Sequence, residues 1–214
     1  MSASVNMDDE YGEMTAQGSY FRTKNYTLDS GTILTEAQVC YQTFGKLNSH
    51  RTNVIFVCHA LTGNAALPSW WGTFLGPGNV FDTEKYFIVC ANVLGSCYGT
   101  SGPTTINAET GKRYGTDFPE VTVRDTVRLH CLMLKSEFDV QRIAAVIGGS
   151  LGGMQALEWG ALYGESLVQS LVVMSCGKAH SPWQIGISEV QRQAIYADKN
   201  WCNGDYDPKH PPTK

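Results

Sequence analysis

Four short apolar runs constrain the fold of this chain more than any other feature of its sequence. They are rich in Val, Ile and Cys and occupy residues 53–61, 86–95, 142–149 and 170–177. The first two runs are continuous, which indicates strands that are covered on both faces of a sheet, and the other two are predicted to be strands as well. Apolar residues at helical spacing follow in three segments, at 121–138, about 151–163 and 183–198. This alternation predicts an α/β domain with a mainly parallel sheet, and right-handed crossovers would place helices on both of its faces.

The chain has 214 residues, a length that suits one domain or most of one larger domain. We expect residues 1–20, which are acidic and polar, to form a flexible lead. A folded core would then span 21–181. Residues 27–47 contain two alternating segments around Asp29-Ser30-Gly31, and this pattern predicts a hairpin.

Composition excludes several classes of partner. The net charge is −4 and no Lys/Arg cluster occurs, so we expect neither nucleic acid nor an anionic membrane as a partner. No apolar run approaches the ~18 residues of a membrane span, and the polar N-terminus does not resemble a signal peptide. The seven cysteines are odd in number and dispersed singly, which favours reduced thiols and a cytoplasmic protein. No metal-ligand cluster, phosphate loop or dinucleotide fingerprint is present, so we expect no bound metal or cofactor.

One serine stands where the third apolar run gives way to a helical pattern. Residues 148–152 read Gly-Gly-Ser-Leu-Gly and match G-x-S-x-G. A nucleophile on a tight strand-to-helix turn adopts strained dihedral angles, and only very small neighbours let the turn close. Ser150 would project above the strand ends, and the backbone N–H of Leu151 would face a developing oxyanion. The alternative is a glycine-rich loop that only packs strand against helix or binds phosphate.

The loop after the first apolar run, residues 58–66, is expected to supply the second oxyanion donor. Leu61 and Thr62 are the candidates, through their backbone N–H groups. His59 precedes the serine, whereas the order in this type of fold is serine, acid, histidine. We therefore interpret His59 as a structural histidine beside the oxyanion loop.

Other reactive or aromatic residues have simpler explanations. Cys97 has no evident base, and Trp70-Trp71 is more typical of core or lid packing than of a substrate platform. Arg124-Asp125 opens a helix as a capping or salt-bridge pair. Asp207 and His210 could complete a triad only if later strands carried them, and the sequence shows none after the fourth run.

Longer segments resemble the homoserine O-acetyltransferase family, and the resemblance runs from about Gly31 to Tyr206. The matching stretches, in order, are HALTG, SWWG, LGPG, FDTEKYFIVCANVLGSCYGTSGPTTIN, YGTDFPEVTVRD and GGSLGGMQALEWG. The resemblance implies an α/β-hydrolase fold in which the serine accepts an acetyl group from acetyl-CoA and passes it to the hydroxyl of homoserine. Ser150 would be the acylated residue, and Leu61 and Leu151 would supply the oxyanion N–H groups.

The resemblance carries further implications. Members often have methionine where this chain has Leu151, a change of little effect for a backbone donor. The loop at 94–103 would border the pocket, residues 182–214 would begin a helical lid, and such lids often form homodimers. The family's triad aspartate and histidine lie beyond Lys214. We therefore expect an incomplete core that, made alone, is nearly inactive and poorly soluble.

Four functional alternatives remain open at this level. Serine could replace homoserine as the acceptor, and succinyl could replace acetyl as the transferred group. An esterase of the same fold would use Ser150 equally well. The chain could also be an inactive fragment or pseudoenzyme that lacks the triad partners.

Overall fold

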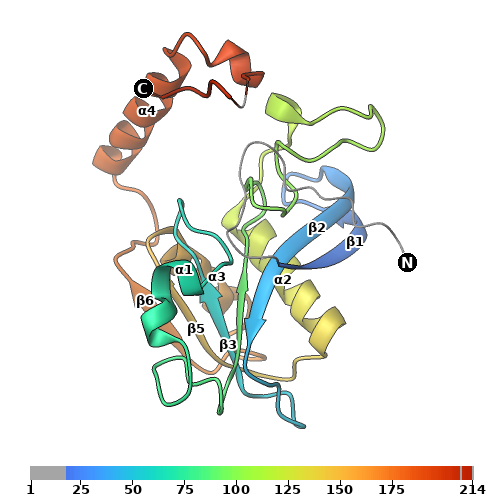
Figure 1. Cartoon of the computed structure of the whole chain (residues 1–214), viewed down its shortest axis with the longest axis vertical. Helices are drawn as coiled ribbons and strands as arrows, with labels where there is room; N and C mark the ends of the chain where they lie inside the picture. Colours follow the sequence, from blue (N-terminus) through green and yellow to red (C-terminus); the bar gives the residue numbers. More distant parts are fainter. Residues whose placement is uncertain (1–17, 208, 214) are drawn as a thin grey trace.

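The computed structural model describes residues 18–207 and 209–213 and shows a six-stranded sheet in the order β1-β2-β4-β3-β5-β6 (Figure 1). The strands are β1 (Ser19–Thr27), β2 (Ile33–Phe44), β3 (Val54–Cys58), β4 (Phe87–Ala91), β5 (Ile143–Gly149) and β6 (Leu171–Met174). The helices are α1 (Pro68–Trp71), α2 (Val123–Phe138), α3 (Leu151–Tyr163) and α4 (Pro182–Tyr196). Three short 3-10 helices, η1 (Gly72–Phe74), η2 (Gly115–Asp117) and η3 (Cys202–Gly204), complete the elements.

The four apolar runs form β3, β4, β5 and β6, and these strands pair in parallel. The predicted, mainly parallel α/β sheet is therefore confirmed. The predicted hairpin turn at 29–31 is also present, between antiparallel β1 and β2. Its first strand, however, extends back to Ser19 and so begins before the predicted core boundary at residue 21. Most of the expected flexible lead, residues 1–17, lies outside the described residues.

The two faces of the sheet bury separate apolar clusters, because neighbouring side chains of a strand point in opposite directions. On β3, Val54 and Phe56 face the larger cluster, where Phe56 packs against Trp159 of α3 with ring centroids 5.2 Å apart. Ile55 and Val57 face the smaller cluster. Helices α2 and α3 cover the first face, and the segment around the short α1 covers the second.

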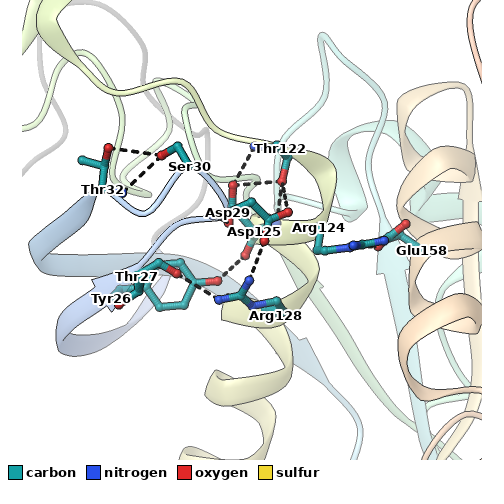
Figure 2. A network of polar contacts seen from close by, with 10 residues as sticks. All are labelled: Tyr26, Thr27, Asp29, Ser30, Thr32, Thr122, Arg124, Asp125, Arg128 and Glu158. Carbon is teal, nitrogen blue, oxygen red and sulfur yellow. Dashed lines mark hydrogen bonds and ion pairs between the residues drawn. The ribbon is translucent and has the colours of Figure 1, made fainter.

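The start of α2 is tied to the β1–β2 turn by a polar network centred on Asp125 (Figure 2). Thr122 and Asp125 form a capping box, in which each side chain accepts a hydrogen bond from the backbone N–H of the other. The second carboxylate oxygen of Asp125 accepts the backbone N–H of Asp29 at 2.8 Å. Arg128 adds an ion pair to Asp29 at 2.6 Å.

The expected role of Arg124-Asp125 as a capping and salt-bridge pair is thus confirmed. Arg124 forms an ion pair with Glu158 of α3 at 2.6 Å, and so links α2 to the helix that follows Ser150.

Helix α4 stands beyond the carboxyl end of the sheet, apart from α2 and α3 (Figure 1). It begins with its own capping box between Ser181 and Gln184. None of the α4 side chains described is buried in the structure. The helix expected at residues 183–198 is present, with the bounds Pro182–Tyr196. Its assignment to a lid stays a prediction.

Candidate active site

Ser150 occupies a strained turn between β5 and α3. Its backbone has φ 56° and ψ −122°, a conformation that costs a non-glycine residue energy and is found at functional sites. Its backbone N–H donates to the carbonyl oxygen of Met174 at 3.0 Å, which fixes the turn against the end of β6. The residue is exposed, and its hydroxyl does not cap α3. The hydroxyl is therefore presented to solvent at the carboxyl end of the parallel strands.

Two of the surrounding glycines are required by close approach of backbone, and a third packs against a cysteine side chain. A Cβ atom on Gly148 would collide with the carbonyl of Gly152, and one on Gly152 would collide with the carbonyl of Cys58. A Cβ on Gly153 would lie 2.6 Å from the Sγ atom of Cys176. Gly149 differs, because its nearest neighbour would be the Cβ of Met174 at 3.8 Å. The steric reason predicted for Gly148 and Gly152 is therefore present in the structure.

The proposed oxyanion donors lie beside this turn because β3 and β5 are adjacent parallel strands that end together. Leu151 is the first residue of α3, so its N–H has no carbonyl one turn earlier in that helix. Leu61 follows β3 in a loop, and its side chain is 74% exposed. Their joint action on an oxyanion stays a prediction.

His59 is held as a neutral structural residue. It is 1% exposed, and its Nε2 atom accepts the backbone N–H of Val93 at 3.2 Å. Because an amide N–H can only donate, the proton must be on Nδ1, which lies 2.8 Å from the carbonyl oxygen of Ala60. Burial lowers the pKa of this imidazole. Both ring nitrogens are engaged, so the interpretation of His59 as structural agrees with its contacts.

Asn92, at the end of β4, holds the loops of the site together. It is fully buried, and its Oδ1 accepts the backbone N–H of Ala65 at 2.7 Å while its Nδ2 donates to the carbonyl of Tyr98 at 2.6 Å. His130 of α2 donates to the backbone carbonyl of Asn92 at 3.0 Å. Sequence reasoning missed Asn92. The available signal was a polar residue near the carboxyl end of the second apolar run, because sites of open α/β sheets form at that end of the strands.

Ser150 lines an apolar cavity of about 590 Å³, which we call the serine cavity; its walls include Asn64, Trp70, Trp71 and Met174. Trp70 donates from its indole N–H to the carbonyl of Asn64 at 3.1 Å, and Trp71 stacks on Phe81 with centroids 5.7 Å apart. The tryptophans therefore pack against the core, as expected, and also form a wall of the cavity.

A second cavity, of about 500 Å³, lies against the loop at residues 58–66, which follows β3. We call it the loop cavity; its lining includes Leu61, Ser96, Thr104, Leu151, Gln155 and Tyr206. Gly63 lines both cavities, and Thr62 lines the serine cavity. The loop at 94–103 forms one wall, through residues 94–98 and Pro103. The two predicted oxyanion donors, Leu61 and Leu151, line the loop cavity, and neither lines the serine cavity.

Comparison with known proteins agrees with this geometry. The model of the alpha/beta hydrolase fold family matches residues 53–214. The chain belongs to this family. It is 50% identical over 212 residues to a homoserine O-acetyltransferase of Chloroherpeton thalassium, covering 99% of this chain and 55% of that protein. The predicted fold and the resemblance to homoserine O-acetyltransferases are thus confirmed, and the chain spans about half the length of the curated relatives it matches.

Solved structures of the same fold include two different activities. The homoserine O-acetyltransferase from Bacillus anthracis superposes with a TM-score of 0.79 at 30% identity, over 89% of this chain and 55% of that one. Esterase E22 superposes with a TM-score of 0.81, also at 30% identity, over 90% of this chain and 56% of that one. The fold therefore accommodates both transfer and hydrolysis.

The other candidates from the sequence lie away from Ser150. Asp207 and His210 form an exposed pair, with His210 Nδ1 2.8 Å from the carboxylate, and neither residue lines the serine cavity. Cys97 lines the loop cavity rather than the serine cavity. All seven cysteines are free thiols: Cys40, Cys58, Cys90 and Cys131 are buried, Cys97 and Cys176 are partly buried, and Cys202 is exposed.

Within residues 18–207 and 209–213, no group of three or more His, Cys, Asp and Glu side chains could hold a metal ion. Over the same residues, every helix is too short or too polar to cross a lipid bilayer.

Proposed function

We propose that this protein is a homoserine O-acetyltransferase, which moves an acetyl group from acetyl-CoA to the hydroxyl of L-homoserine in methionine biosynthesis. The observation that carries the proposal is the strained, exposed turn at Ser150, closed by glycines that tolerate no Cβ atom. The 50% identity to curated homoserine O-acetyltransferases supports this choice of reaction among those of the family.

The reaction would proceed in two half-reactions. The Ser150 hydroxyl loses its proton to a base and attacks the thioester carbonyl; the C–S bond breaks, and the CoA thiolate leaves with a proton. The homoserine hydroxyl then attacks the acetyl-serine ester, and Ser150 regains its proton. In both halves the negative oxygen would accept hydrogen bonds from the N–H groups of Leu61 and Leu151.

The base would come from residues other than the described ones that line the serine cavity. No imidazole or carboxylate belongs to the described residues that line this cavity. The resemblance assigns an aspartate and a histidine to positions beyond Lys214, and the chain spans only 55% of its relative's length. A serine hydroxyl is a weak nucleophile without a positioned base, so we expect slow acylation of the 214-residue chain.

The finer features of the proposal follow from the resemblance and the composition. Acetyl-CoA acts as a co-substrate and no cofactor stays bound. Seven free thiols suit a reducing cytoplasm. A homodimer formed through α4 is the proposed assembly. Serine as the acceptor and succinyl as the transferred group are the alternative substrates, and the side chains of the acceptor and acyl pockets decide between them.

An esterase is the second candidate, because esterase E22 superposes as well as the transferase does. The two activities differ only in what attacks the acyl-enzyme, water or an amino-acid hydroxyl.

Intact-protein mass spectrometry tests the proposal. The 214-residue chain is incubated with acetyl-CoA, in imidazole buffer that supplies a small base, beside a Ser150→Ala control. We expect the mass of one acetyl group to be added to the wild-type chain and not to the control. Release of this group on addition of L-homoserine indicates transfer, whereas release in buffer alone indicates an esterase. Acetylation of the Ser150→Ala variant to the same extent overturns both readings.

A further inference from the structure

The imidazole of His59 fixes the direction of one peptide group in the loop at residues 58–66. Its Nδ1–H donates to the carbonyl oxygen of Ala60 at 2.8 Å, and the backbone N–H of Gly63 donates to the same oxygen at 2.9 Å. The second bond closes a β-turn over residues 60–63, in which Leu61 and Thr62 are the central residues. Two donors therefore hold a single carbonyl in place.

The Ala60 carbonyl belongs to the same peptide group as the Leu61 N–H. A trans peptide is planar, so its N–H points in the direction opposite to its C=O. Because the carbonyl is held toward His59 and Gly63, the N–H of Leu61 is directed away from the interior of the turn. Among the described residues, this N–H donates to no backbone carbonyl. Hydrogen bonds to the carbonyl also polarise the peptide group and strengthen its N–H as a donor.

His59 is itself fixed at both ends. Its Nε2 atom accepts the backbone N–H of Val93 at 3.2 Å, and its carbonyl oxygen accepts from the Nε2 atom of Gln155 at 3.2 Å. His59 and Gln155 are each 1% exposed, so these bonds lie in the interior. The imidazole therefore has one orientation in the folded chain, and its Nδ1–H faces Ala60 rather than solvent.

Gln155 connects this loop to the helix that carries the other proposed oxyanion donor. Leu151 begins α3, and Gln155 lies four residues later on the same face of that helix. A Cβ atom on Gly152 would lie 3.0 Å from the carbonyl oxygen of His59, so α3 also contacts the loop directly. The two N–H groups are thus tied to one rigid frame, in which His59 is the last link to Leu61.

We propose that His59 is a positioning residue: through the neighbouring carbonyl, it aims the Leu61 N–H at the negative oxygen that forms when Ser150 is acylated. This inference rests on the proposed function, which makes Ser150 the nucleophile. It assigns a role in the reaction to a histidine that cannot serve as the base, because both of its ring nitrogens are already bonded. It also distinguishes the two loop candidates, since the bonds to the Ala60 carbonyl orient the N–H of Leu61 rather than that of Thr62.

Acylation by a matched pair of aryl esters tests this role. In para-nitrophenyl acetate the atom that becomes negative is oxygen, and in para-nitrophenyl thionoacetate it is sulfur, which accepts hydrogen bonds more weakly. In each reaction the Ser150 oxygen bonds to the carbonyl or thiocarbonyl carbon, para-nitrophenolate leaves, and the serine proton passes to the buffer. Intact-protein mass spectrometry follows both rates, and the Ser150→Ala chain gives the background. The ratio of the two rates reports on the oxyanion donors, because a smaller folded fraction slows both reactions equally.

Two substitutions separate the contacts of the His59 ring. In His59→Gln the amide oxygen reaches the place of Nε2 and can accept from Val93, but no donor remains for Ala60. In His59→Asn the amide lies at the place of Nδ1 and keeps that donor. We expect His59→Gln to slow acylation by the oxygen ester about tenfold or more and to lower the oxygen-to-sulfur ratio, as disorientation of one oxyanion donor predicts. His59→Asn should restore most of the ratio, and His50→Gln, at an exposed histidine, is the control that should match the wild-type chain.

The outcomes separate this inference from the proposed function. Equal ratios in the wild-type chain and His59→Gln, or equal losses in both His59 variants, overturn the inference and leave Ser150 as the nucleophile. If Ser150→Ala is acylated as fast as the wild-type chain, the proposed function fails and the inference fails with it. A measurement on the wild-type chain keeps the test valid should a His59 variant fail to fold. Long-range proton–nitrogen NMR spectra of the imidazole should show the proton on Nδ1, and a proton on Nε2 overturns the inference.

Discussion

Ser150 keeps its strained backbone conformation because the contacts of the residues around it fix the turn. The carbonyl of Gly152 packs against the Cα atom of Gly148, and the carbonyl of Cys58 packs against the Cα atom of Gly152. The Ser150 N–H donates a hydrogen bond to Met174 at the end of β6. The strain is therefore compensated by contacts with β3 and β6, neighbours on both sides of β5. A hydroxyl in this position is available for chemistry because the fold, rather than the serine side chain, closes the turn.

Substitution of Gly152 by alanine tests this account. The new methyl group would collide with the carbonyl of Cys58, so we expect the free energy of unfolding to fall by about 3 kcal/mol or more, as overpacking of a rigid backbone predicts. Gly149→Ala is the control, since its methyl group would meet only ordinary contacts. Urea denaturation measures both. Equal stability of the two variants would contradict the steric argument.

His130 gives the protein an acid-sensitive point. Burial lowers the pKa of this histidine from 6.5 to about 4 in the folded state, so the unfolded state binds its proton more readily. His130 therefore lowers the free energy of unfolding as the pH falls from 6.5 toward 4, by about 3 kcal/mol in total, and has no such effect above pH 6.5. His59, whose pKa burial also lowers, acts in the same direction.

Unfolding free energies measured between pH 7 and pH 4 check this dependence. We expect the decline to be shallower in His130→Gln than in the wild-type chain. His50→Gln, at an exposed histidine, serves as the control and should follow the wild-type profile. A His130→Gln profile parallel to that of the wild-type chain would show that His130 is not the source.

Among the elements, α2 has the most closely defined beginning. Asp125 is fully buried and accepts hydrogen bonds from the N–H and hydroxyl of Thr122 and from the N–H of Asp29. The hydroxyl of Tyr26 also donates to its backbone carbonyl at 2.6 Å. One carboxylate therefore caps a helix and attaches the β1–β2 turn to it (Figure 2). Val121, Thr122 and Val123 line the loop cavity, so this attachment also shapes that wall.

Removal of the Asp125 carboxylate should weaken both the cap of α2 and the attachment of the β1–β2 turn. Asp125→Ala leaves the N–H groups of Thr122 and Asp29 without their acceptor, and we expect a loss of about 3 kcal/mol in unfolding free energy. The matched control is Glu120→Ala, at an exposed acidic residue just before the helix. Thermal unfolding followed by circular dichroism reports the difference. A change in Asp125→Ala no larger than that of the control would count against the network as an anchor.

For the molecule as a whole, β6 is an edge strand with exposed apolar side chains. Leu171, Val172 and Val173 are 38%, 43% and 38% exposed, and β6 pairs only with β5 among the described strands. Unpaired backbone groups beside apolar side chains promote association with another edge. We therefore expect the 214-residue chain to self-associate as its concentration rises.

Sedimentation velocity over a range of concentrations tests this expectation. Val172→Lys places a charge on the edge and should keep the chain monomeric at concentrations where the wild-type chain associates. Ile33→Lys is the control, because Ile33 is an exposed apolar residue at the distant β2 end of the sheet. If both lysine variants reduce association equally, the edge of β6 is not the contact.

Local physics made part of this structure predictable from the sequence. The apolar runs became β3 to β6 because short runs of β-branched apolar residues favour strands, and the turn at Ser150 followed from the steric demands of Gly148 and Gly152. The capping role of Asp125 was likewise expected from residues close to it in the chain. Such features depend on spacing over a few residues, which a sequence displays directly.

Only the tertiary structure decided which polar atoms meet and which stay unpaired. The bonds of Gln155 to His59 and of His130 to Asn92 join residues 96 and 38 positions apart, and they exist because β3 lies between β4 and β5. The loop cavity, which Gln155 lines, arises from the same arrangement. Strand order is a property of the whole packed chain, and no local pattern around Gln155 or Asn92 encodes it.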